Sequence, residues 1–295
     1  HERLGLFAAR QHAHRLVHPG RLACIHVKDR IMFGNVTGFG CPTVNPFHAK
    51  TMFHYMQHGF LFMGMITVVT DVVRENNQTY RLGYTEMRKD GTKMGVGSPE
   101  YILLMRKPST DKTKAYADDR VAKDKEDYSL ARWQVDAHAF WRSSGNRQIT
   151  PEEMAKMKPD VLAKLFTDWS LENVYDYDAH VQIGEALLGR HALPSTFMSL
   201  APGSNHEAVW HDVTRMLTLN SEQSRKAQEK HICPLQFDIV DRLIERFSAK
   251  GELVFDPFGG LMTTPYRALK LGRRGMATEL NGRYFIINDI DRFIR

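Results

Sequence analysis

A glycine-rich loop near the carboxyl end constrains the fold of this chain more than any other segment. The loop reads DPFGGLMTT over residues 256–264, and the apolar run Leu253–Phe255 precedes it. A short apolar run of this kind is typical of a buried strand. Helical spacing follows as far as Leu271, and a second strand is expected over Gly275–Glu279. Strand, loop, helix and strand in this order predict a βαβ unit and hence an α/β fold.

The residues of this loop also indicate what it binds. Glycines after a first strand let the backbone approach a ligand, and the start of the helix directs N–H groups at it. Glu279 lies 19 residues after Gly260, where a carboxylate can accept hydrogen bonds from both hydroxyls of a ribose. The loop lacks the G-x-G-x-x-G spacing of dinucleotide sites, and Asp256 would repel a pyrophosphate. A cationic sulfonium cofactor that carries an amino acid suits this loop better.

The rest of the chain alternates apolar segments with polar or glycine-rich ones. Strands are expected at 21–27, 60–73 and 101–106, helices at 47–58, from Pro234 to about Lys250 and from Tyr284, and a loop at 34–46. Residues 108–130 carry mixed charge, which is typical of a linker or a solvated surface, and residues 150–230 are helical in patches.

Composition places the chain among ordinary globular proteins. Of the 295 residues, 42% are hydrophobic and 25% charged, and the net charge is +6. Residues 1–110 hold 14 basic and 7 acidic side chains, so the positive charge is concentrated there, which permits a polyanionic partner. The three cysteines form no CxxC motif, which indicates a reducing cytoplasm and excludes a cysteine-rich zinc site. The longest apolar run, Phe60–Val69, is too short to span a bilayer.

The loop DPFGGLMTT resembles the D-P-F-x-G-x-G-T-T motif of the S-adenosylmethionine-dependent DNA amino-methyltransferases, which modify adenine N6 or cytosine N4. Eight further segments resemble that family: His18–Leu22, Ile25–Asp29, Glu100–Leu104, Val209–Val213, His231–Gln236, Ala268–Arg274, Thr278–Asn281 and Tyr284–Phe285. Their order is that of a circularly permuted member, with the catalytic half first and the cofactor loop last. Met262 stands where the family has a third glycine, so the loop is expected to be reshaped or to lie farther from its ligand.

The resemblance implies a class I methyltransferase with a Rossmann-like sheet and an inserted, mainly helical segment. It implies a catalytic-side half over residues 1–107, an inserted target-recognition segment over 108–205 and a cofactor-binding half over 206–295. The expected cofactor is S-adenosylmethionine and the expected partner double-stranded DNA with a flipped target base. The residues implied for the cofactor are Asp256, Pro257, Phe258, Gly259, Gly260, Thr263, Glu279, Asn281, His231, Cys233 and Pro234.

The catalytic tetrapeptide of that family, (D/N/S)-P-P-(Y/F), does not occur in the sequence. The segment Ser98–Tyr101 (SPEY) is similar, but it is expected to begin a strand, whereas the tetrapeptide follows one. Its Glu100 would also need a polar partner if buried. The family order places the tetrapeptide upstream of His1, so the chain is expected to be an N-terminally truncated fragment, with a sheet incomplete on that side and no activity alone.

Two basic, polar segments are candidates for DNA contacts. Residues 74–93 combine cations with tyrosines and amides between two expected strands, and residues 141–147 are similar. An ordinary solvated hairpin or loop is the alternative for each. The candidate DNA-binding residues are Arg74, Asn76, Asn77, Gln78, Arg81, Arg88, Lys89, Lys93, Arg142, Asn146 and Arg147.

Other functions remain open from the residues alone. A non-catalytic DNA- or cofactor-binding relative would show the same βαβ unit, and a nicotinamide-dependent oxidoreductase is a further alternative. His54 and His58 have the i,i+4 spacing of a metal pair, but no Cys or carboxylate lies near them in the sequence, so no metal site is expected.

Overall fold

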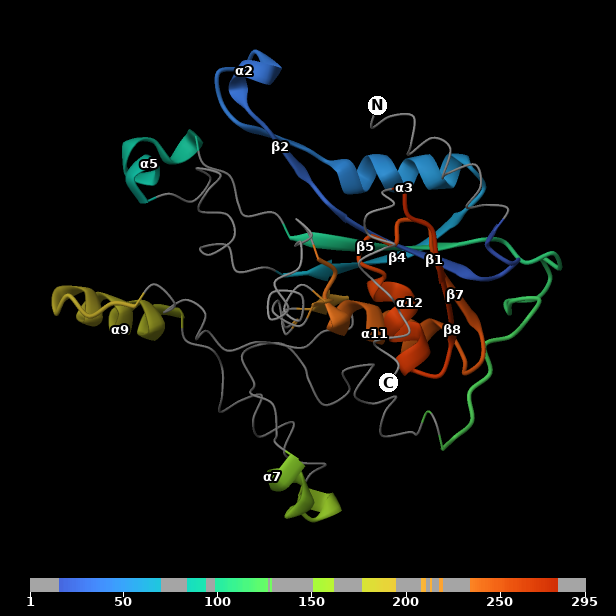
Figure 1. The fold of residues 1–295 in the computed structure, drawn as a ribbon. Coiled ribbons are helices and arrows are strands. Elements are labelled where there is room, and N and C mark those ends of the chain that lie inside the picture. Colours follow the sequence, from blue (N-terminus) through green and yellow to red (C-terminus); the bar gives the residue numbers. More distant parts are fainter. Residues whose placement is uncertain are drawn as a thin grey trace.

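The computed structural model describes residues 16–69, 84–93, 99–126, 128, 151–161, 177–194, 208–210, 213, 218–219 and 234–280 (Figure 1). The strands are β1 (Leu22–Lys28), β2 (Arg30–Met32), β3 (Thr43–Asn45), β4 (Leu61–Val68), β5 (Glu100–Arg106), β6 (Val209–Trp210), β7 (Leu253–Asp256) and β8 (Arg274–Ala277). The helices are α2 (Gly34–Thr37), α3 (Phe47–Gln57), α5 (Tyr84–Lys89), α7 (Pro151–Ala155), α9 (Tyr177–Gly189), α11 (Phe237–Phe247) and α12 (Thr263–Lys270), with a 3-10 turn at Gly91–Lys93.

The larger sheet has the strand order β1-β5-β4-β6. β5 lies antiparallel to both β1 and β4, and β4 pairs in parallel with β6. Ile102 of β5 packs on one face with Ile239 of α11, while its neighbour Leu103 packs on the other face, next to Met52 of α3. Because both faces are covered, β5 reads as a continuous apolar run. Figure 1 shows the sheet between α3 and the α11–α12 pair.

The βαβ unit expected at the carboxyl end is confirmed. β7 and β8 are parallel, with Leu253 opposite Arg274 and Asp256 opposite Ala277, and α12 connects them. A Cβ on Gly275 would lie 2.6 Å from Cα of Pro265, so glycine allows the helix to cross close to the strand. On its other side α12 packs against α11 through Ala268, Val240 and Ile244.

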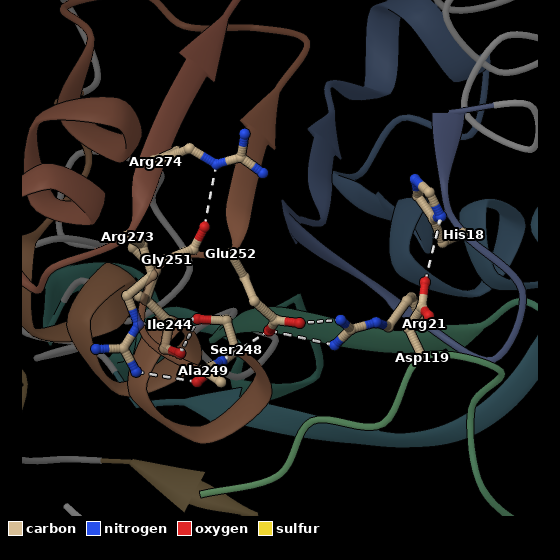
Figure 2. Close-up of polar contacts among 10 residues, drawn as sticks. All are labelled: His18, Arg21, Asp119, Ile244, Ser248, Ala249, Gly251, Glu252, Arg273 and Arg274. Atoms are coloured by element: carbon tan, nitrogen blue, oxygen red, sulfur yellow. Dashed lines mark hydrogen bonds and ion pairs between the residues drawn. The ribbon is translucent and has the colours of Figure 1, made fainter.

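Polar contacts join the starts of β1 and β7 (Figure 2). The guanidinium of Arg21, directly before β1, is paired with the carboxylate of Glu252, directly before β7. The same carboxylate accepts a hydrogen bond from the N–H of Ala249 at 2.7 Å. Nearby, Arg273 donates to the carbonyl of Ser248 at 2.9 Å. The βαβ unit is therefore fixed to the larger sheet at the starts of these two strands.

One structural expectation was wrong. Residues 34–46 do not form a plain loop, because they contain α2 and β3, and β3 pairs with β2 as an antiparallel hairpin in which Ile31 lies opposite Val44. The glycines between the two strands belong to a compact turn at the tip of the hairpin, not to an irregular segment. The helix expected from Tyr284 lies outside the described residues. Among the described helices, none is long and apolar enough to cross a membrane.

Candidate cofactor and DNA sites

Asp256, the last residue of β7, shapes the loop that follows it. One carboxylate oxygen accepts the N–H of Phe258 at 2.9 Å, and the other accepts the hydroxyl of Thr264 at 2.6 Å. The carboxylate thus closes the loop against the first turn of α12. Sequence reasoning did not single out Thr264, because its contact with Asp256 depends on how the loop folds back.

The two glycines of the loop are required for different structural reasons. A Cβ on Gly259 would lie 2.8 Å from Cβ of Ala277 and 2.9 Å from Sδ of Met262, so this position admits no side chain. Gly260 adopts a positive φ of 50° and donates its N–H to Oε2 of Glu279 at 2.8 Å. The structure therefore brings together the glycine loop and the acidic residue that the sequence pattern predicted as the ribose ligand.

Met262 keeps a glycine-like backbone where the related motif has its third glycine. Its φ is 63°, a left-handed conformation that costs a non-glycine residue about 1–2 kcal/mol. The side chain is buried. Its N–H is bonded to the carbonyl of Gly259 at 2.7 Å, and its own carbonyl accepts the N–H of Tyr266 at 3.1 Å. The methionine thus fills the space beneath the loop while the turn itself is kept.

The remaining predicted cofactor residues fall in several places. Phe258 is exposed, whereas Thr263 is buried at the start of α12. The hydroxyl of Thr278 donates to the carbonyl of Pro257 at 2.9 Å, which ties the loop to the end of β8. Pro234 lies just before α11, and its neighbour Leu235 packs on the core of the α11–α12 pair. The residues His231, Cys233 and Asn281 lie outside the described part of the chain.

A second contact between α11 and α12 was not anticipated from the sequence. Arg267 of α12 makes a two-pronged ion pair with Asp241 of α11, at 2.7 and 2.5 Å. The hydrogen bond that Arg267 donates to Asp241 raises the pKa of Arg267 despite partial burial. The guanidinium also lies over the ring of Phe237, 4.8 Å from its centre. The two residues are distant in sequence, so no local pattern signals the pair.

The segment that resembles a catalytic tetrapeptide begins a strand, as expected. Glu100 is the first residue of β5, and its mostly buried carboxylate lies 2.8 Å from Nε2 of His26 and 3.8 Å from Nζ of Lys28. Tyr101 stacks on His48 with ring centres 4.1 Å apart. The glutamate therefore has the polar partners that its burial requires, and a structural role accounts for the segment.

The predicted DNA contacts are described only in part. Arg88 and Lys89 are exposed on α5, and the guanidinium of Arg88 lies over the ring of Tyr84. Lys93 belongs to the 3-10 turn at Gly91–Lys93. The others lie outside the described residues: Arg74, Asn76, Asn77, Gln78, Arg81, Arg142, Asn146 and Arg147. β4 and β5 are the two expected strands that flank residues 74–93, and they are neighbours in the sheet.

His54 and His58 lie together at the C-terminal end of α3. Nδ1 of His58 lies 2.8 Å from the carbonyl oxygen of His54, and the rings are 4.2 Å apart. In the described part of the chain, no three His, Cys, Asp or Glu side chains are grouped as metal ligands.

The profile of the DNA methylase family, which covers N6 and N4 methyltransferases, matches residues 6–289. The chain belongs to this family. It is a DNA methyltransferase, as the resemblance in its motifs implied, and the family membership rules against a nicotinamide-dependent oxidoreductase. S-Adenosylmethionine, the cofactor of such enzymes, agrees with the expectation from the loop. Among curated proteins, none matches this sequence.

Comparison with solved structures supports the fold. A putative DNA modification methylase from Thermus thermophilus, complexed with S-adenosyl-L-methionine, is similar with a TM-score of 0.53 and 20% identity. The similarity covers 100% of this chain and 76% of that one. A second structure of the same Thermus protein has a TM-score of 0.49 and 19% identity over 97% of this chain and 73% of that one. The first likeness confirms the α/β methyltransferase fold.

Proposed function

We propose that this methyltransferase acts on the exocyclic amine of adenine (N6) or cytosine (N4) in double-stranded DNA, and that the target base leaves the helix to be modified. The observation that carries the proposal is the bond between Gly260 and Glu279, which assembles a nucleoside-binding loop at the end of a βαβ unit. An exocyclic amine in a duplex is paired and stacked, so an enzyme that acts on it has to extrude the base. The Thermus protein similar in fold binds the same cofactor, which supports this assignment.

The residues of the loop fit S-adenosylmethionine. We assign the ribose hydroxyls to Glu279, whose carboxylate is oriented by the N–H of Gly260. The backbone at Gly260 carries no Cβ, so a ligand can approach it closely. The exposed ring of Phe258 lies at the surface of the same loop and offers an apolar contact. His231, Cys233 and Asn281 remain predicted cofactor contacts.

The motif suggested a direct contact of Asp256 with the cofactor, and we propose instead that this residue shapes the loop. Both of its carboxylate oxygens accept hydrogen bonds from within the loop, from Phe258 and Thr264. We therefore assign Asp256 to holding the loop closed. Its negative charge, placed at the carboxyl end of β7, also favours a cationic ligand over a pyrophosphate. Thr263, which is buried, supports the start of α12 in the same way.

Methyl transfer requires the protein mainly to position the cofactor and the target base. When bound, S-adenosylmethionine supplies an electrophilic methyl group on its sulfonium. The protein binds the cofactor, orients the base and excludes water, which are the contributions expected for such a transfer.

The sequence holds no (D/N/S)-P-P-(Y/F) segment, so no residue of this chain is assigned to the amine itself. We keep the proposed division into a catalytic-side half at 1–107, a recognition segment at 108–205 and a cofactor-binding half at 206–295. The proposed location of the protein is the cytoplasm.

Calorimetry tests the cofactor class. S-Adenosylhomocysteine and NAD are titrated separately into the protein. Binding of S-adenosylhomocysteine with no heat from NAD is the expected result, because the loop has no place for a pyrophosphate. Tighter binding of NAD would overturn the proposal.

A further inference from the structure

The hairpin β2–β3 is held rigidly at its base. Asp29 lies directly before β2, and His48 lies in the first turn of α3, just after β3. Oδ1 of Asp29 accepts the backbone N–H of His48 at 3.0 Å and also lies 2.8 Å from its Nδ1. The imidazole in turn stacks on Tyr101 of β5. The two ends of the hairpin are thus clamped to each other and to the larger sheet.

The tip of the hairpin, residues 33–41, has a defined backbone conformation. α2 forms one helical turn, and the N–H of Gly38 closes it by bonding to the carbonyl of Gly34 at 2.9 Å with a positive φ of 78°. A Cβ on Gly34 would lie 2.5 Å from the carbonyl carbon of Gly40, so the two sides of the tip touch through backbone alone. Figure 1 shows α2, at this tip, away from both the four-stranded sheet and the β7–β8 pair.

The tip presents large apolar side chains to solvent. Phe33 is 55% exposed, Val36 70% and Phe39 77%. Three such side chains on one compact tip differ from a scattered exposed residue, and a cluster of this kind marks an interaction site. Phe60, by contrast, which follows α3, is almost fully buried.

The charge around the tip selects the kind of partner. No acidic residue occurs between Asp29 and Asp71, and Asp29 is engaged by His48. The cations Arg30, on β2, and Lys50, on α3, are both exposed. An apolar tip with the exposed cations Arg30 and Lys50 on the segments beside it fits a polyanion with an apolar interior, which describes double-stranded DNA. A two-stranded ribbon also has the width that the major groove admits.

We propose that the hairpin β2–β3 inserts its apolar tip into the DNA duplex, with Phe33 and Phe39 as wedge residues and Arg30 and Lys50 on the phosphates. Apolar side chains that enter between base steps unstack and kink the duplex. Extrusion of a base leaves a gap in the stack, and an apolar side chain can fill it. The inference rests on the proposed function, since it assumes that duplex DNA is the substrate.

The test measures binding of the protein to a fluorescently labelled mixed-sequence duplex by anisotropy. The variant Phe33→Ser/Phe39→Ser is compared with Phe53→Ser, because Phe53 on α3 is 58% exposed and lies outside the hairpin. The hairpin variant is expected to weaken binding about tenfold, as loss of stacked aromatic contacts does, while Phe53→Ser binds as the wild type. The hairpin variant should keep the wild-type slope of log affinity against log salt concentration. Arg30→Gln should reduce that slope by about one, because it removes one phosphate contact.

A second readout keeps the result independent of folding. In Phe39→Trp, insertion into the base stack should quench the new indole when DNA is added, and Phe53→Trp should show no such change. Wild-type affinity in the hairpin variant, with no quenching at position 39, would overturn the inference while the proposed function stands. Failure of the wild type itself to bind DNA would instead overturn the proposed function. A loss of self-association in the hairpin variant, seen by sedimentation with unchanged DNA affinity, would assign the tip to a second copy of the chain and overturn the inference.

Discussion

Oε2 of Glu279 accepts the backbone N–H of Gly260 at 2.8 Å, across the gap between the end of β8 and the loop after β7. This bond orients the carboxylate and fixes the loop at the same time. The loop is held further by Asp256, through Phe258 and Thr264. The proposed nucleoside site is therefore preorganised by contacts of the protein with itself, which lowers the free-energy cost of ordering the loop on binding.

Met262 gives the first prediction, on stability. Met262→Ala and Met262→Gly both lose a buried side chain, at a cost of about 2–5 kcal/mol for the alanine variant. Glycine should nevertheless be the more stable of the two by roughly 1 kcal/mol, because it adopts the positive φ at this position without strain. Urea denaturation measures the difference. A glycine variant less stable than the alanine variant would show that the backbone at Met262 is not left-handed in solution.

The close crossing of α12 over β8 gives a second prediction. Gly275→Ala places a Cβ 2.6 Å from both Cα and the carbonyl oxygen of Pro265. The helix has to shift, and we expect a loss of about 1–3 kcal/mol of unfolding free energy. Gly189→Ala is the matched control, because a Cβ there meets nothing within 4 Å. Equal stability of the two variants in urea would contradict the observed packing of the βαβ unit.

The contact between Arg21 and Glu252 gives a prediction on pH. Burial disfavours the charged carboxyl of Glu252, but hydrogen bonds from Arg21 and from the N–H of Ala249 outweigh it, and the pKa lies below its ordinary value of 4.5. The unfolded chain therefore takes up this proton at a higher pH than the folded one. The stability that Glu252 contributes is present above the ordinary pKa and is lost as the pH falls through the folded value.

The variant Glu252→Gln isolates this effect. The wild type should be more stable than Glu252→Gln at neutral pH, and the difference should shrink as the pH falls below about 4.5. Urea midpoints in a series of acidic buffers measure it, with Glu126→Gln on the exposed surface as the control. A difference that stays constant over this range would mean that the ion pair does not hold the two sheets together.

The ion pair between Arg267 and Asp241 gives a fourth prediction. A double-mutant cycle with Arg267→Met and Asp241→Leu should yield a coupling energy of about 1–3 kcal/mol, because two short charge-assisted hydrogen bonds join α11 and α12. Thermal or urea unfolding of the four proteins provides the values. Additive effects of the two substitutions would show that the helices are held by apolar contacts alone.

Sequence reasoning succeeded where a pattern is local. The βαβ unit was predicted from one loop and its flanking apolar runs, and α11 was placed within a few residues of its bounds. Glu279, the predicted ribose ligand, lies beside the glycine loop as the pattern indicated, because its distance from Gly260 follows from the length of one helix and one strand. The hairpin β2–β3 was missed, because glycines such as Gly34 and Gly38 suggest irregular structure when their packing is unseen.

Features that depend on tertiary contacts could not be predicted. The partner of Arg267 lies on another helix, and the left-handed backbone of Met262 contradicts the ordinary preference of its residue type. The contacts of Asp256 could not be predicted for a similar reason, since only the folded loop shows that both of its carboxylate oxygens accept hydrogen bonds from neighbours.

Titration of S-adenosylhomocysteine into the wild type and Glu279→Ala tests the central claim most directly. Glu279 both orients the loop and is assigned to the ribose, so the substitution should weaken binding at least tenfold, or about 1.4 kcal/mol, while Glu126→Ala leaves it unchanged. Thermal unfolding confirms that each variant is folded. Wild-type affinity in Glu279→Ala would contradict the assignment of the loop after β7 as the cofactor site.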